Sequence, residues 1–220
     1  MFTGSSPFAN YVDTTFLMIV GISALVLIGL VAAMLYFVFR YSRKRNPHPT
    51  NIEGNLSLEI AWTAIPVVLF MGMFYMGWEG YKQMTEVPPD AIPIRVTARM
   101  WSWSFEYPNG VVTDTLVVPV QKPVKLMLRS MDVNHSMYIP AFRIKKDAIP
   151  NRENIMWFST PEAKSYDIAC AEYCGLRHAY MYTRLVALDA GAFEEWYRSV
   201  SQKAAKPYEP LVRVVTSDRK

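Results

Sequence analysis

Two long uncharged stretches near the start of the chain limit its fold more than any other feature. They cover residues 14–39 and 60–78, and neither contains Asp, Glu, Lys or Arg. Because an α-helix rises about 1.5 Å per residue, about 20 apolar residues cross the hydrocarbon core of a bilayer. The sequence therefore predicts a membrane hairpin at 1–81, with helices at about 14–39 and 60–78 joined by the loop 40–59.

Each stretch has an alternative interpretation. For residues 14–39 the alternative is a signal peptide, but residues 1–13 contain no Lys or Arg, and the stretch is longer than a signal peptide's apolar region. For residues 60–78 the alternative is a buried core helix, because the length only just suffices to span a bilayer. Pro66 lies within this second stretch, where a membrane helix can bend without breaking.

Basic residues predict the orientation of the hairpin. The loop 40–59 contains Arg40, Arg43, Lys44 and Arg45, whereas no basic residue precedes the first stretch. Cytoplasmic loops are enriched in Lys and Arg, so we expect this loop in the cytoplasm or in the mitochondrial matrix. Both termini would then face the opposite side, together with an external domain at 82–203 and a polar tail at 204–220.

The composition excludes several classes of protein. Apolar residues make up 51% of the chain and charged residues 19%, which rules out an intrinsically disordered chain. Two cysteines are too few for a disulfide-stabilised scaffold of 220 residues. The external domain is net basic but has no basic run longer than two residues before the tail, so the sequence indicates no nucleic-acid partner.

The external domain has the pattern of a β-protein. Short segments that alternate apolar and polar residues are separated by Pro, Gly, Asn and Asp, which is typical of strands joined by turns. Strands at this spacing favour an antiparallel sandwich or barrel. One helix is expected near the end, where Phe193, Trp196 and Val200 share a face. The predicted strands cover 94–107, 116–120, 123–131, 155–160, 165–170 and 180–188.

One short segment of the external domain concentrates side chains that bind metals. Cys170, Cys174, His178 and Met181 lie within 12 residues, directly after a predicted strand, and His135 lies 35 residues upstream. The remaining histidine, His48, belongs to the loop 40–59, which is expected on the other side of the membrane. Every cysteine of the chain, and every histidine on this side, can therefore belong to one cluster.

The donor set restricts which metal such a cluster would bind. Thiolates, imidazoles and a thioether are soft ligands, which favour copper or zinc over magnesium or calcium. A mononuclear blue copper site needs one Cys, which leaves one thiolate over. Two bridging thiolates fit a pair of coppers, in which each metal also receives one histidine and one weak ligand, Met181 or a backbone carbonyl. Such a site has no open coordination position, which indicates electron transfer rather than catalysis.

Two other interpretations of the cluster stay open at this point. A disulfide between Cys170 and Cys174 is compatible with an external domain, although the histidines nearby disfavour it. A structural zinc ion would use two Cys and two His and would leave Met181 without a role.

The cluster and its surroundings resemble a known family. The pattern C-x-E-x-C-G-x-x-H-x-x-M at 170–181, with D-x-x-H-S at 132–136, resembles the CuA motif of subunit II of cytochrome c oxidase. The resemblance covers nearly the whole chain and includes L-E-I-A-W-T-x-I-P at 58–66, W-x-W-x-F-E-Y at 101–107 and D-A-I-P-N-R at 147–152. It implies a two-helix transmembrane hairpin followed by an all-β, cupredoxin-like Greek-key sandwich.

The resemblance also implies roles for individual residues. The side chains that it implies as copper ligands are those of His135, Cys170, Cys174, His178 and Met181. It implies the backbone carbonyl of Glu172 as a further copper ligand, and the side chain of Glu172 as a ligand of a magnesium ion shared with subunit I.

Two further residues have roles that the resemblance implies. Trp101 matches the position at which an electron arrives from cytochrome c, and a strand-face tryptophan packed in the core is the alternative. Glu59 matches a glutamate at the mouth of a proton channel into subunit I. The alternative for Glu59 is a carboxylate that stabilises the start of a helix.

The implied function is electron transfer within a respiratory oxidase. The copper centre would accept electrons from an external donor such as cytochrome c and pass them to heme in subunit I. Oxygen would be reduced to water there, with proton translocation, so this chain would be a non-catalytic subunit of an enzyme. The implied partners are subunit I, other oxidase subunits, a c-type donor and membrane lipid. The implied location is the bacterial inner (plasma) membrane or the mitochondrial inner membrane, with both termini and the copper domain on the periplasmic or intermembrane side.

Two other functions are compatible with the sequence. A CuA subunit of a nitric oxide reductase-type complex would share the ligand spacing, and a membrane-anchored copper chaperone would favour more exposed, exchangeable ligands.

The chain departs from the family in two features. Arg177 stands where the family often has Asn. The net basic external domain favours a neutral or acidic electron donor through electrostatic steering.

Overall fold

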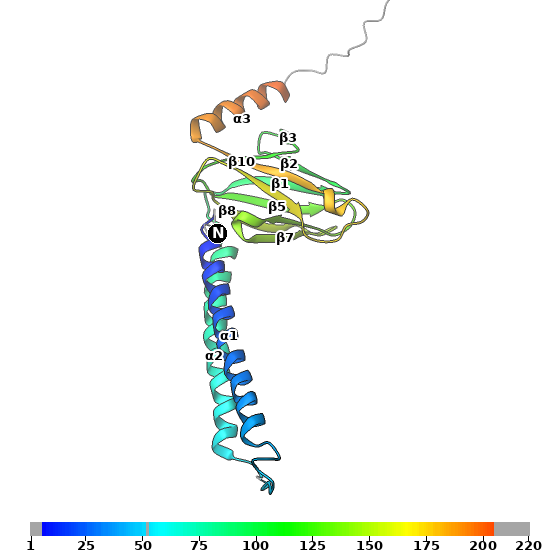
Figure 1. Cartoon of the computed structure of the whole chain (residues 1–220). Coiled ribbons are helices and arrows are strands. Elements are labelled where there is room, and N and C mark those ends of the chain that lie inside the picture. Colours follow the sequence, from blue (N-terminus) through cyan, green and yellow to red (C-terminus); the bar gives the residue numbers. More distant parts are fainter. Residues whose placement is uncertain (1–5, 52, 205–220) are drawn as a thin grey trace, which may run out of the picture. The chain divides into compact units, whose positions relative to one another are not determined.

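The chain forms two compact units. The structure, a computed structural model, describes residues 6–51 and 53–204. The units are Met1–Val87 and Pro88–Lys220 (Figure 1). The division falls later than the expected boundary after residue 81 because the second helix continues to Thr85. Of the predicted polar tail at 204–220, residues 205–220 lie outside the described residues.

The first unit is a pair of helices that are longer than the uncharged stretches. Helix α1 covers Ala9–Arg40 and α2 covers Leu56–Thr85, and the two run side by side in Figure 1. Each is long and apolar enough to cross a membrane. Leu25 and Val68 are 73% and 70% exposed, respectively. A helix with large apolar side chains on all sides suits lipid or other membrane helices rather than water.

Specific contacts define how α2 begins and how it meets α1. The Asn55 side chain accepts a hydrogen bond from the Leu58 N–H at 3.1 Å, and Glu59 Oε1 accepts one from the Asn55 N–H at 3.4 Å. These reciprocal bonds form a variant of the capping box in which the glutamate lies at the fourth helical position instead of the third, and they satisfy N–H groups that the first helical turn leaves unpaired. Near the other end, the Tyr11 ring lies so close to Gly80 that a Cβ atom there would overlap it. Gly80 therefore permits the two helices to approach closely.

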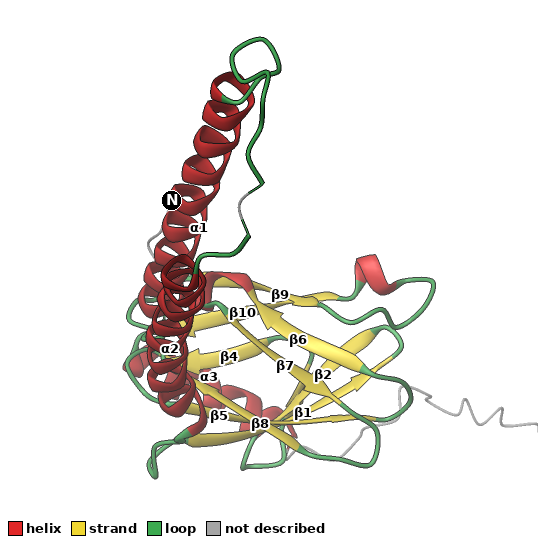
Figure 2. Ribbon diagram, turned by 90° about the horizontal axis from the view of Figure 1, so that it is seen from below, coloured by secondary structure: helices red, strands yellow, loops and turns green. Residues whose placement is uncertain are grey.

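The second unit contains two five-stranded sheets that form a sandwich (Figure 2). The first sheet has the order β3 (Val112–Thr113), β2 (Ser102–Glu106), β1 (Ile92–Arg99), β5 (Val124–Ser130) and β8 (Asn154–Phe158). The second has the order β4 (Leu116–Pro119), β10 (Tyr182–Leu188), β9 (Ser165–Cys170), β6 (His135–Ile139) and β7 (Ile144–Ala148). A short helix, η1 (Pro140–Phe142), joins β6 to β7.

The core lies between the inner faces of these sheets. Side chains alternate between buried and exposed along β1 and β5, as expected for strands with one face against a core. Val96, Phe105 and Phe158 of the first sheet and Ile168 and Leu185 of the second are fully buried. Burial of the apolar side chains of this core is the main contribution to the stability of the sandwich.

The predicted sandwich is confirmed, but the prediction that it is antiparallel is wrong. β1 pairs with β5 in parallel, and β10 pairs with β4 in parallel. The chain passes from β4 in the second sheet to β5 in the first, so β5 returns beside β1 in the same direction. Turn residues in the sequence mark where strands end, but they carry no information on which strand becomes the neighbour.

Several strand boundaries also differ from the prediction. The single strand predicted at 94–107 is two strands, β1 and β2, separated by a turn at Met100 and Trp101. No Gly or Pro marks this turn, which is held from outside: the Met100 N–H donates to Asp132 Oδ2 at 2.7 Å. The prediction missed β3, β6 and β7, which are short or interrupted by polar residues.

The C-terminal helix packs on the sandwich through aromatic side chains. Helix α3 covers Ala190–Ala204, and its Trp196 lies edge-on to Tyr107, with ring centroids 5.2 Å apart. The Tyr107 hydroxyl donates to Val117 O at 2.9 Å and accepts from the Val117 N–H at 2.8 Å. Burial raises the pKa of Tyr107 to about 12, against smaller lowering effects of its hydrogen bonds. Tyr107, the residue directly after β2, is thus hydrogen-bonded to β4 and packed against α3.

Candidate metal centre

Two neighbouring strands bring together the residues of the predicted cluster. His135 is the first residue of β6, and Cys170 is the last residue of β9. β6 and β9 are antiparallel neighbours in which Met137 is opposite Cys170. The 35 residues that separate His135 from Cys170 in sequence are thus bridged by strand pairing.

A compact loop after β9 carries the remaining candidates. The Cys170 N–H donates to Met181 O at 3.1 Å, which closes the loop at its base. The Ala171 N–H donates to Ser136 O at 2.9 Å and anchors the loop to β6. His178 begins a short helix, η2 (His178–Tyr180), which leads back into β10. Both ends of the loop are therefore held by the sheet.

The donor atoms gather around the two sulfurs. Cys170 Sγ lies 3.8 Å from Cys174 Sγ and 3.9 Å from His135 Nδ1. Cys174 Sγ lies 3.5 Å from His178 Nδ1 and 3.8 Å from Met181 Sδ. The ligand atoms of His135, Cys170 and Cys174 all lie within 4.8 Å of one another, close enough to hold a metal ion. The structure therefore brings together all five side chains that the sequence singled out.

The backbone supplies a sixth candidate ligand atom, next to the Cys170 sulfur. Cys170 Sγ lies 3.3 Å from the carbonyl oxygen of Glu172, whereas the Glu172 residue is exposed at the surface. Its carbonyl thus lies at the cluster, and its carboxylate is accessible from outside.

The state of the cysteines favours a metal over a disulfide. Both are free and buried, and their separation of 3.8 Å far exceeds the S–S bond of about 2.05 Å. Two sulfurs at this separation can share a metal at a metal–sulfur distance of about 2.3 Å. Burial raises the pKa of the Cys174 thiol to about 11, and the neighbouring Cys170 makes a smaller contribution in the same direction. A cation between the sulfurs would remove this opposition to ionisation, because metal ligation favours the thiolate.

A carboxylate that the sequence did not single out orients one of the imidazoles. His135 is fully buried, and its Nε2 lies 2.8 Å from Asp132 Oδ1. Partial burial opposes ionisation of Asp132, but hydrogen bonds from the Met100 N–H, from His135 and from the Val133 N–H outweigh it and lower its pKa to about 2. An ionised Asp132 keeps the proton on Nε2 and leaves Nδ1, on the side of the sulfurs, available to a metal. The D-x-x-H spacing was the only signal of this role in the sequence.

Trp101 lies against the ligand loop rather than in the core. It is only partly buried, and its Nε1–H donates to the carbonyl oxygen of Cys174 at 3.2 Å. Gly175 has a φ of +112° and faces the Trp101 ring, where a Cβ would lie 3.5 Å from Cζ2. A glycine is required there for the positive φ. The alternative of a core tryptophan applies instead to Trp103, which is buried and lies edge-on to the His135 ring at 6.2 Å.

The last two residues singled out by the sequence do not belong to the cluster. Arg177 is exposed and immediately precedes His178, which is partly buried. Glu59 lies in the other unit, in the first turn of α2, where its side chain takes part in the capping box. Its position supports the alternative of a carboxylate that stabilises a helix start.

Comparisons with known proteins agree with this arrangement. Residues 1–76 match the transmembrane domain of cytochrome c oxidase subunit II, and residues 110–187 match its periplasmic domain. Cytochrome c oxidase subunit 2 of Alkalihalophilus pseudofirmus is 31% identical over 206 residues, covering 88% of this chain and 60% of the relative. The Cereibacter sphaeroides subunit 2 is 29% identical, covering 88% of this chain and 78% of the relative. The chain thus spans about three fifths of the first relative.

A solved structure extends the comparison to the fold. The periplasmic domain of subunit II of cytochrome oxidase (CoxB) of Bradyrhizobium japonicum is 31% identical, with a TM-score of 0.51. The similarity covers 54% of this chain and 99% of that one. The predicted order, a membrane hairpin followed by a cupredoxin-like domain, is confirmed. The chain therefore belongs to the family of cytochrome c oxidase subunit II.

Proposed function

We propose that this chain is the electron-accepting subunit of a cytochrome c oxidase and holds a binuclear copper centre. The observation that carries the proposal is a pair of free, buried thiols 3.8 Å apart with an imidazole beside each sulfur. The side chains that would hold the metals are His135, Cys170, Cys174, His178 and Met181, together with the Glu172 carbonyl. Copper bound there would supply one-electron transfer without an open coordination position.

The chain's own contribution is a rigid and dry environment. Three of the five side chains, His135, Cys174 and Met181, are at most 3% exposed, which excludes water from most of the donor set. Strand pairing holds His135 and Cys170, and the loop that carries the other donors is hydrogen-bonded to the sheet at its base. Donor atoms that cannot move far keep bond lengths similar in both oxidation states, which favours fast electron transfer. Asp132 adds a fixed orientation for the His135 ring.

The proposal assigns the remaining steps to neighbouring proteins. Electrons would arrive from a c-type donor at Trp101, whose indole is bonded to the ligand loop, and leave for heme in subunit I. Oxygen reduction and proton translocation would occur in subunit I, so this chain would have no catalytic residue. The exposed carboxylate of Glu172 supports a magnesium site shared with that subunit.

The membrane unit would anchor this domain on the outer side. The basic loop after α1, with Arg40, Arg43, Lys44 and Arg45, supports a cytoplasmic or matrix location for the loop. The β unit would then face the periplasm or intermembrane space, from a bacterial inner membrane or the mitochondrial inner membrane. A role for Glu59 at a proton channel stays a prediction.

The test of the copper proposal is spectroscopic. We expect the full chain, purified in detergent and loaded with copper, to show a hyperfine pattern from one unpaired electron shared by two copper nuclei. C170S should abolish this pattern, whereas S165A, at the exposed start of the same strand, should retain it. The pattern of a single copper nucleus, or one zinc ion per chain by metal analysis, would contradict the proposal.

The identity of the enzyme is tested separately. The relatives described above carry the name of cytochrome c oxidase, which favours an oxidase over a nitric oxide reductase-type complex. The chains that copurify in mild detergent, and their heme spectrum, would distinguish the two enzymes.

A further inference from the structure

The outer face of the first sheet carries an excess of positive charge. Arg95 and Arg99 on β1, and Lys125 and Arg129 on β5, alternate with buried apolar residues, so all four side chains lie on the outer face. The only carboxylate on the strands of this sheet is Glu106 of β2. We call the surface formed by the four cations the basic face.

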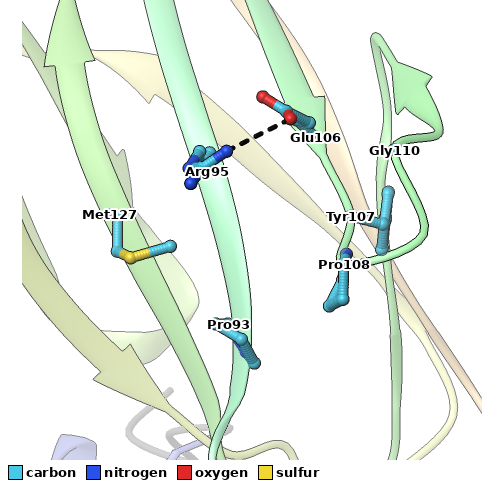
Figure 3. Close-up of a pocket in the computed structure, with 7 residues that line it drawn as sticks. All are labelled: Pro93, Arg95, Glu106, Tyr107, Pro108, Gly110 and Met127. Atoms are coloured by element: carbon cyan, nitrogen blue, oxygen red, sulfur yellow. Dashed lines mark hydrogen bonds and ion pairs between the residues drawn. The ribbon is translucent and has the colours of Figure 1, made fainter.

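Glu106 neutralises only one of these cations. Figure 3 shows the ion pair between Arg95 and Glu106, which are 3.3 Å apart on neighbouring strands, at a shallow pocket of about 220 Å³. Within residues 6–51 and 53–204, no carboxylate lies within 4.0 Å of the charged groups of Arg99, Lys125 or Arg129. Arg129 Nε donates instead to the Thr97 hydroxyl at 3.3 Å. Three cations of the basic face therefore have no ion-pair partner among the described residues.

The second sheet has a different charge distribution. Lys145 lies 2.6 Å from Asp147, and Arg184 lies 3.9 Å from Asp167. The two carboxylates of its strands are thus both paired with cations. Among the strands of the two sheets, only those of the first carry several cations without a carboxylate partner.

The basic face adjoins the loop proposed to receive electrons. β1 ends at Arg99, and the next two residues are Met100, which is 47% exposed, and Trp101. On the neighbouring strand β5, Arg129 is opposite Thr97. Thr97 precedes Arg99 on β1 by two residues. Arg99 and Arg129 therefore lie at the end of the sheet where Trp101 meets the carbonyl of Cys174.

We infer that the basic face, centred on Arg99 and Arg129, binds a small soluble one-electron donor protein whose docking surface is rich in carboxylates. The inference rests on the proposed function, because it names the partner of the same electron-transfer site. Opposite charges on two docking surfaces speed their encounter and orient the proteins, while like charges disfavour the wrong partner. A donor held there would place its redox group beside Trp101, and a donor with a basic docking surface would be repelled.

The experiment measures binding rather than turnover. The full chain in detergent is titrated calorimetrically with two c-type cytochromes, one with a net negative and one with a strongly positive charge, at low and high salt. The test variant is R99Q/R129Q. The matched control is R184Q/K164Q, which removes the same two charges from exposed positions outside the basic face.

We expect the acidic cytochrome to bind the chain more tightly than the basic cytochrome does. R99Q/R129Q should lower the affinity for the acidic cytochrome about tenfold at low salt and have little effect at high salt. The control variant should bind the acidic cytochrome like the unmodified chain. Tighter binding of the basic cytochrome would overturn the inference, as would equal weakening by both double variants. A copurifying subunit that covers the basic face and blocks both cytochromes would also overturn it.

The copper spectrum separates this inference from the proposed function. If the full chain shows no binuclear copper signal, the proposed function fails whatever the binding data are. If the signal is present and unchanged in R99Q/R129Q, a loss of binding reports on the basic face alone.

Discussion

At the residue scale, Asp132 decides how His135 presents its ring to the cluster. Replacing Asp132 with Ala removes the acceptor for the Nε2 proton, so both ring orientations become accessible to His135. We expect D132A to lower copper affinity by about 10- to 100-fold, measured by competition with a chelator. D132N keeps an oxygen acceptor and should lose less.

The control for Asp132 is Asp167, which lies on β9 with its side chain 70% exposed. D167A should leave copper affinity unchanged. Equal affinities for D132A and the unmodified chain would show that strand pairing alone positions His135.

A second residue-scale prediction concerns Trp101. W101F removes the N–H that donates to Cys174 O but keeps an aromatic ring against Gly175. We expect slower reduction of the copper centre by a cytochrome donor in stopped-flow measurements, with an unchanged copper spectrum. W196F on α3, away from the ligand loop, should not slow the reaction. An unaltered rate in W101F would remove the proposed role.

A third prediction concerns Arg177, the fixed positive charge next to His178. A nearby cation stabilises the reduced, less positive form of a metal site, so it raises the reduction potential. We expect R177N to lower the midpoint potential by tens of millivolts at low salt, on the order of 1 kcal/mol for an exposed charge. Spectroelectrochemical titration measures this shift, which should shrink as salt is added.

At the scale of elements, Tyr107 ties α3 and β4 to β2. Its folded-state pKa of about 12 lies above its ordinary value of 10.0, so the neutral phenol stabilises the folded state fully below pH 10. This stabilisation is lost as the pH rises through 12, by about 2–3 kcal/mol in total. Y107F cannot ionise and also loses both hydrogen bonds with Val117.

We therefore expect Y107F to be about 2 kcal/mol less stable near pH 8 but to lose less stability between pH 9 and 12. Chemical unfolding of the detergent-solubilised chain, followed by tryptophan fluorescence, measures both effects. The control is Y182F, because Tyr182 is 64% exposed. Parallel pH profiles for Y107F and the unmodified chain would contradict this account.

At the scale of the whole molecule, the two units should respond differently to metal. The candidate ligands all lie in the unit Pro88–Lys220. Copper at 1,000 times its dissociation constant should stabilise that unit by about 4 kcal/mol, because it binds only the folded state. Calorimetry should show a higher Tm for the β unit with copper and no change in the C170S/C174S variant.

The two units differ in how much of their structure could be predicted from the sequence. The helices at 14–39 and 60–78 were predictable because a membrane helix is specified by a continuous local property, the absence of charge over about 20 residues. The strands of the β unit were located only in part, because their partners lie far away in sequence. The break at Met100 depends on an acceptor, Asp132, that lies 32 residues away.

The sequence by itself determined the donor set, since soft side chains at 170–181 and His135 restrict the metal by their chemistry. It also determined the membrane hairpin, for which local hydropathy suffices. Only the tertiary structure decided that His135 meets Cys170, that Asp132 orients its ring, that Trp101 touches the ligand loop and that the cations of two parallel strands gather on one face. These features arise from strand pairing between distant segments, which depends on packing across the whole sandwich and leaves no local pattern in the sequence.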